Sequence, residues 1–76
     1  MISVKLVSQS SGKPISGKSV SLGFDGNWLP GGVTKAQRTN SNGEVDFDVS
    51  PGKGKVYVDG RNAHEGQLAG RVVVYI

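Results

Sequence analysis

Apolar and polar residues alternate along most of the chain, which is the period-2 pattern of half-buried β-strands. The clearest runs begin at Ile2, Val20 and Val45, and in each run an apolar side chain recurs at every second position. A further run centres on Val56 and Val58, which share one face. No stretch has the 3.6-residue period of an amphipathic helix. The pattern therefore predicts an all-β chain.

Two segments depart from the simple alternation. Residues 33–39 are mostly polar, and their one candidate inner face carries only Thr34, Ala36 and Arg38. This composition indicates a strand at the edge of a sheet. Residues 70–76 are apolar on both faces, with one row of Val72, Val74 and Ile76 and another of Val73 and Tyr75. We expect this last strand to be covered on both sides.

Turn signals separate the runs. Residues 40–43 read NSNG, in which Asn and Gly tolerate the positive φ of tight turns. Pro51 and Gly52 suit the central positions of a type II turn, with Gly at a positive φ. After Asp59 and Gly60, residues 61–70 fit a short strand, a turn or an irregular loop equally well. Six or seven short strands without a helix indicate an antiparallel sandwich or a small barrel.

Length and composition limit the choices further. Seventy-six residues form one domain, residues 1–76, with no room for helices around a parallel sheet. The chain has no Cys, which excludes a disulfide framework and a thiolate metal site, and we expect no cofactor. No apolar run has the length of a signal peptide core or a membrane span. We expect a cytoplasmic protein, unless the chain is a module of a longer exported one.

Residues 12–19, GKPISGKS, match the phosphate-binding pattern G-x-x-x-x-G-K-[ST]. That pattern binds phosphate where it ends a strand and opens a helix, because the first N–H groups of the helix point at the anion. Here the following residues, from Ser19 to Phe24, alternate as a strand, and DGNWLPGG then interrupts the chain. The stretch is predicted to be a loop between two strands.

The order of strands and turns resembles the transthyretin-like, or prealbumin-like, sandwich modules, which include carboxypeptidase regulatory-like domains and collagen-adhesin B-type repeats. The resemblance covers residues 2–60 and is carried by Gly12, Pro14, Ile15, Gly17, Val20, Leu22, Thr39, Gly43, Phe47, Pro51, Gly52, Tyr57 and Val58. It implies a small antiparallel Greek-key β-sandwich of six to seven strands. It also implies that Ile15 packs against the end of the core and that the chain around residues 44–54 passes from one sheet to the other.

Two functional branches of these modules depend on residues that this chain lacks. Adhesin repeats with an internal Lys to Asn or Asp crosslink need an acceptor on the last strand. Lys5 offers the amine, but residues 70–76 contain neither Asn nor Asp. The related hydroxyisourate hydrolases end in Tyr-Arg-Gly-Ser, whereas this chain ends in Val74, Tyr75 and Ile76. The resemblance therefore implies a protein that is not an enzyme.

Two pairs of polar residues are of types that can carry out acid-base or metal chemistry. Asp46 and Asp48 share a strand face about 7 Å apart, a separation typical of paired catalytic carboxylates. An exposed strand face lacks the walled cleft that raises the pKa of one acid, so charge that discourages aggregation is the favoured role. His64 and Glu65 lack the further ligands of a metal site, and an ordinary loop His is favoured.

The net charge of +3 leaves a basic patch to consider, with Lys13, Lys18, Lys53 and Lys55 as its candidate residues. The alternative function is therefore a small basic β-barrel that binds nucleic acid weakly and in a salt-dependent way. The aromatic residues are not interleaved with the basic ones along one strand, so nucleic acid is disfavoured and solubility is the favoured role of the charge.

Trp28 lies in the Gly-rich stretch DGNWLPGG and either caps one end of the core, which is favoured, or stands exposed as a contact. The candidate ligand contacts are Asn27, Trp28 and Tyr57. The sequence predicts a non-enzymatic structural or binding module that presents loops and an edge strand to a protein or carbohydrate partner. A homodimer through the strand at residues 70–76 is a secondary hypothesis.

Overall fold

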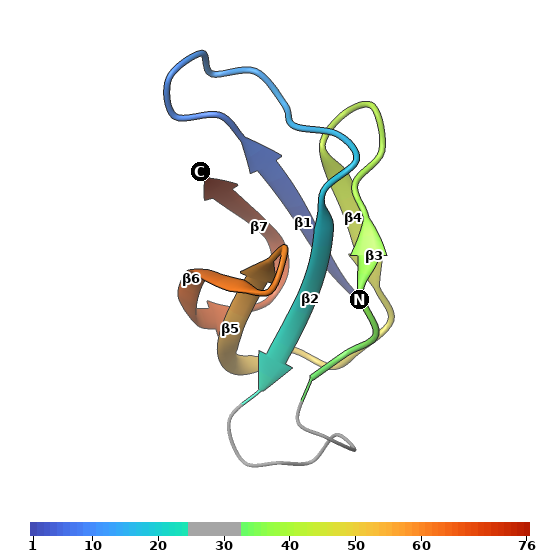
Figure 1. The fold of residues 1–76 in the computed structure, drawn as a ribbon. Coiled ribbons are helices and arrows are strands. Elements are labelled where there is room, and N and C mark those ends of the chain that lie inside the picture. Colours follow the sequence, from blue (N-terminus) through green and yellow to red (C-terminus); the bar gives the residue numbers. More distant parts are fainter. Residues whose placement is uncertain (25–32) are drawn as a thin grey trace.

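The computed structural model describes residues 1–24 and 33–76, which form seven strands in two sheets (Figure 1). One sheet has three strands in the order β4-β1-β7, namely β4 (Glu44–Phe47), β1 (Ile2–Val7) and β7 (Gly70–Tyr75). The other has four strands in the order β3-β2-β5-β6, namely β3 (Gln37–Arg38), β2 (Ser19–Phe24), β5 (Gly52–Val58) and β6 (Arg61–Leu68). The sheets do not close into a barrel. Within the described ranges no helix is long and apolar enough to cross a membrane.

The core lies between the two sheets and is built from alternate residues of their strands. Its fully buried side chains are Ile2, Val4, Leu6, Val20, Leu22, Phe47, Val56, Leu68 and Val74. The inward faces predicted for β1, β2, β4 and β5 are confirmed. Ile15, Val49 and Ala63 are half-buried against this cluster, as the resemblance implied for Ile15.

At several points the chain leaves one sheet and enters the other. It passes from β4 in the three-stranded sheet to β5 in the four-stranded one, which agrees with the crossing expected around residues 44–54. It crosses back between β6 and β7, at Ala69. β7 lies beside β1 and parallel to it. The expectation of a wholly antiparallel fold is therefore wrong at this pair.

The segment 8–18 is a loop between β1 and β2, as predicted. Backbone bonds within it join Ser8 to Lys13 (2.9 Å) and Gly12 to Ser8 (2.8 Å), and β2 follows at Ser19 where a phosphate-binding loop would open a helix. The turn at residues 40–43 is also confirmed. Asn40 Oδ1 accepts the N–H groups of Asn42 (2.9 Å) and Glu44 (3.0 Å) and so closes this turn.

The segment 33–39 is an edge, as predicted, but its pairing with β2 as a strand is limited to Gln37–Arg38. The predicted inner face is wrong, because Ala36 and Arg38 are exposed and Thr34 is only half-buried. The residue that turns inward is Thr39, whose hydroxyl is used in hydrogen bonds to the 8–18 loop. Such a short strand has no regular inner face for an alternation to predict.

The type II turn predicted at Pro51 and Gly52 is wrong. Gly52 does not have a positive φ, and it begins β5 opposite Leu68 of β6. A Cβ on Gly52 would lie 3.4 Å from the ring of Phe24, an ordinary van der Waals contact, so neither the φ angle nor packing requires glycine at this position.

Residues 61–70, which the sequence left open, contain β6 and the start of β7. Asp59 and Gly60 have φ of 52° and 82°, the two positive values that a type I′ hairpin turn requires, and they join β5 to β6. The ladder then shifts register, since Tyr57 faces Asn62 while Val56 faces His64. This bulge breaks the period-2 pattern of β6, which is why alternation does not identify the strand.

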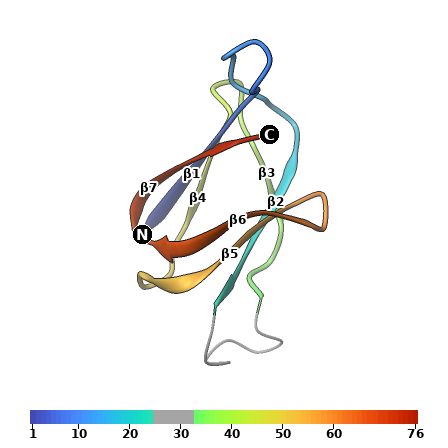
Figure 2. The ribbon, with the colours of Figure 1, turned by 90° about the vertical axis from the view of Figure 1, so that its left-hand side faces the viewer.

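β7 is covered on one face only, contrary to expectation. Val72 and Val74 are buried, whereas Val73, Tyr75 and Ile76 keep 40%, 59% and 37% of their surface exposed. The structure has two layers, so the outer face of the three-stranded sheet has no described element over it (Figure 2).

Candidate functional site

β7 has one paired side and one open side. Its strand partner within the described chain is β1 alone. Ile76 directs its backbone toward β1, because its N–H donates to Val7 O (2.9 Å) and its carbonyl accepts from Gln9 N (2.9 Å). Alternate residues of a strand direct these groups to opposite sides. The N–H and C=O groups of residues 71, 73 and 75 therefore face the open side, which we call the β7 edge.

The side chains of the β7 edge lie on the outer face of the three-stranded sheet. Arg71 reaches across β1 and its Nη2 donates to Glu44 Oε2 on β4 at 2.8 Å. Val73 and Tyr75 have no such polar contact and are exposed. The carbonyl of Tyr75 accepts a long bond of 3.3 Å from Gln9 Nε2. The β7 edge thus combines backbone groups that have no backbone partner in the described chain with two exposed apolar side chains.

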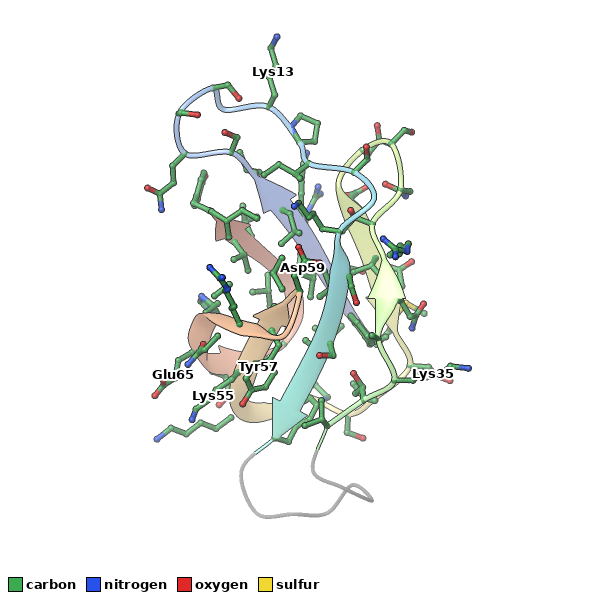
Figure 3. All side chains as sticks on the ribbon, viewed as in Figure 1. Lys13, Lys35, Lys55, Tyr57, Asp59 and Glu65 are labelled. Atoms are coloured by element: carbon green, nitrogen blue, oxygen red, sulfur yellow. The ribbon has the colours of Figure 1, made fainter. Side chains whose placement is uncertain are left out.

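A second surface lies on the outer face of the four-stranded sheet and is centred on Tyr57, which is half-buried. In register with Tyr57 are Ser21 on β2 and Asn62 on β6, and the next outward row joins Gly23, Lys55 and Glu65. We call this surface, with Lys53 and Gln67 at its end, the Tyr57 face. Figure 3 shows Lys55 and Glu65 together at its margin. The β2 residues beside Tyr57 are small, and the amide of Asn62, on its other side, lies 3.5 Å from Glu65 Oε1.

The four candidate lysines do not form one patch. Lys13 lies in the 8–18 loop and Lys55 near the other end of the molecule (Figure 3). Lys18 precedes β2, whereas Lys55 pairs with Gly23, five residues or about 16 Å further along that strand. Only Lys53 and Lys55 share a face, where their neighbours on β6 are Gln67 and Glu65.

Lys18 is instead part of a small charged cluster at the β5–β6 turn. Its Nζ lies 3.4 Å from Asp59 Oδ2, and Asp59 Oδ1 accepts the backbone N–H of Ser19 at 3.2 Å. The Ser19 hydrogen bond lowers the pKa of the Asp59 carboxyl, and the hydrogen bond and charge of Lys18 and the charge of Arg38 act in the same direction. Desolvation, which is second in size to the Ser19 hydrogen bond, acts against them and raises this pKa.

The other polar pairs do not converge on a site. Asp46 is exposed and accepts a hydrogen bond from Ser3 Oγ at 2.6 Å, while Asp48 lies beyond the end of β4. In residues 1–24 and 33–76 no three acidic or His side chains come close enough to hold a metal ion, His64 and Glu65 included. No pocket is found in this part of the chain. Asn27 and Trp28 lie outside the described residues.

Sequence reasoning missed Asn62 and Gln67 of the Tyr57 face and the bond between Arg71 and Glu44. The first two were missed because residues 61–70 had no assigned structure, although the Asp-Gly pair before them is a strong hairpin signal. The third depends on which strands flank β1, which alternation does not reveal.

No protein-family model, curated protein or solved structure matches this chain. The architecture is a small all-β domain of two sheets.

Proposed function

We propose that the chain is a non-enzymatic binding module that presents the β7 edge to a protein partner. The observation that carries this proposal is the open side of β7, where the backbone groups of residues 71, 73 and 75 lie beside the exposed side chains of Val73 and Tyr75. An extended peptide can add to such an edge as a further strand. Main-chain hydrogen bonds then give affinity, and alternate side chains give specificity.

We also propose that the module is of the Greek-key, transthyretin-like type. Two features support this finer assignment. The loop between the first two strands places Ile15 against the core, and the chain crosses between the sheets from β4 to β5, both as the resemblance implies. In modules of this kind the sandwich is a rigid frame, and binding belongs to loops and edges.

The test is selection of linear peptides from a random displayed library, followed by amide NMR mapping on the wild-type protein. We expect selected peptides to shift the amides of residues 71, 73 and 75. Val73→Pro removes an N–H on the open side and leaves the bonds to β1 in place, so it should weaken peptide binding at least about tenfold. Val73→Ala keeps the N–H and is the matched control. Peptides that shift only β2, β5 and β6 would contradict the proposal.

Carbohydrate is the second candidate partner, and the Tyr57 face favours it. A half-buried tyrosine ring with Ser21 on one side and Asn62 on the other offers both an apolar surface and hydrogen-bonding groups to a sugar ring. A panel of soluble oligosaccharides should then shift the amides of Tyr57 and Asn62 at low and physiological salt alike. Tyr57→Ala should abolish the shifts, and Tyr75→Ala, on the other sheet, should not.

A further inference from the structure

The four sheet edges in the described chain are not equally protected against pairing. β3 is only two residues long, and β4 has four residues with Glu44 and Asp46 on its outer face. β6 carries a bulge and mostly polar side chains. Short length, charge and bulges are the devices by which edges avoid other strands. β7 has six residues, GRVVVY, with no Lys, no Pro and no break in its register with β1.

The single charge on β7 is also withdrawn from the edge. Arg71 is held by Glu44 at 2.8 Å on the far side of β1. Figure 2 is drawn from this side of the molecule, and in it β7 runs from beside the N-terminus of the chain to the C-terminus. An open apolar edge of this length is suited to another strand of the same kind.

We propose that the partner of the β7 edge is a second copy of this chain, paired antiparallel through β7 about a twofold axis at Val73. The inference rests on the proposed function, that the β7 edge accepts a strand, and specifies which strand it accepts. The two three-stranded sheets would become one sheet in the order β4-β1-β7-β7-β1-β4.

The backbone fits this register. In an antiparallel pair, residues that exchange both of their hydrogen bonds must direct N–H and C=O toward each other. Residues 71, 73 and 75 direct these groups to the open side of β7, because Ile76 directs its own toward β1 and alternate residues of a strand point to opposite sides. With the axis at Val73, this residue faces its own copy and Arg71 faces Tyr75 on both sides. All three open residues are then used, with about six hydrogen bonds, whereas an axis at residue 72 or 74 leaves one of them outside.

The side chains fit as well. Val73 meets Val73 of the second copy as an apolar pair. Each Arg71 lies opposite Tyr75, and its guanidinium stays with Glu44. No acidic residue lies on β7, and no like charges face each other in this register. An axis at Arg71 would instead place residues 73 and 75 opposite residues 69 and 67, which lie outside β7.

The interface has the size of one strand pair, so the dimer is expected to be weak, with a Kd on the order of 100 µM. Sedimentation velocity from about 10 µM to about 2 mM should show monomer converting to dimer. Val73→Lys and Val73→Glu each place like charges opposite each other at the axis and should each abolish the dimer. An equimolar mixture of the two should restore it as a heterodimer, because only at a twofold axis does residue 73 face residue 73.

Val33→Lys is the matched control, since Val33 is an exposed valine on the four-stranded side of the fold, and it should dimerise as the wild type does. Amide spectra establish that each variant is folded. A wild-type protein that stays monomeric at about 2 mM overturns the inference, as does a dimer that persists in both charge variants or a mixture that stays monomeric. The proposed function is tested separately at about 10 µM, where the protein is monomeric, by whether selected peptides shift the amide signals of residues 71, 73 and 75.

Discussion

The hydroxyl of Thr39 donates to the carbonyl oxygen of Ile15 at 2.8 Å and accepts the backbone N–H of Lys18 at 3.1 Å. Thr39 is buried, and these two hydrogen bonds hold the 8–18 loop against the end of β3. Further N–H groups of the loop are also used internally, since Ile15 N donates to Leu6 O and Gly17 N to Thr39 O, each at 3.0 Å. A phosphate would find these donors engaged, although the sequence matches the phosphate-binding pattern.

Thr39→Val should lower the free energy of unfolding by about 1–3 kcal/mol, because it leaves the Ile15 carbonyl and the Lys18 N–H without their partner. Urea unfolding followed by circular dichroism measures the change. Thr39→Ser keeps the hydroxyl and should lose less than the Val variant. An equal loss in both variants would contradict this account, because the methyl group that Ser lacks would then matter as much as the hydroxyl that Val lacks.

The sequence predicts much of the fold because alternation is a local signal. Val45 and Phe47 on β4 and Val56 and Val58 on β5 are read directly from their neighbours, and their burial follows. What alternation does not contain is which strands lie side by side. The parallel pairing of β1 with β7 joins residues about 70 apart in sequence, so it depends on the packing of the whole chain.

The candidate sites are predicted less well for the same reason. Tyr57 was identified, but its neighbours Asn62 and Gln67 lie beyond a bulge that removes the period-2 signal. Lys18 looks like a free cation in the sequence, and only the hairpin turn brings Asp59 to it. Charge counted along a chain does not show which charges are already paired.

Gly54 should be intolerant of substitution. It faces Phe24 on β2, and a Cβ there would overlap the carbonyl oxygen of Gly23. Gly54→Ala should therefore cost about 1–3 kcal/mol, because β2 and β5 must separate locally. Gly52→Ala is the control on the same strand. Its Cβ would lie 3.4 Å from the Phe24 ring, and the change should stay below about 1 kcal/mol in urea unfolding. Similar losses in both variants would contradict this account.

Asp59 should contribute stability that depends on pH. Its pKa in the folded state is lowered, first by the hydrogen bond from Ser19, so the ionised form is favoured in the native protein. The contribution is then present above the unfolded pKa of about 3.9 and is lost as the pH falls through the lower folded value.

Asp59→Asn tests this contribution without disturbing the turn, since Asn also tolerates the φ of 52° found there. The urea midpoint of the variant should lie below that of the wild type at pH 7, and the two should converge as the pH falls below the lowered pKa of Asp59 in the folded state. A difference that stays constant with pH would show that the carboxylate charge is not responsible.

Binding to single-stranded nucleic acid should be weak, and its affinity should fall only slightly as the salt concentration rises. Among the four lysines first considered, Lys53 and Lys55 share a face, whereas Lys13 is at the other end and Lys18 is paired with Asp59. Two phosphate contacts give a slope of log K against log salt of about −1.4, and four would give about −2.8.

Fluorescence anisotropy of a labelled oligonucleotide between about 20 and 200 mM salt measures this slope. The Lys53→Ala, Lys55→Ala double variant should remove it, while Lys13→Ala should leave it unchanged. A slope near −2.8 would mean that the four lysines act together on one strand, and nucleic acid would then displace protein as the proposed partner.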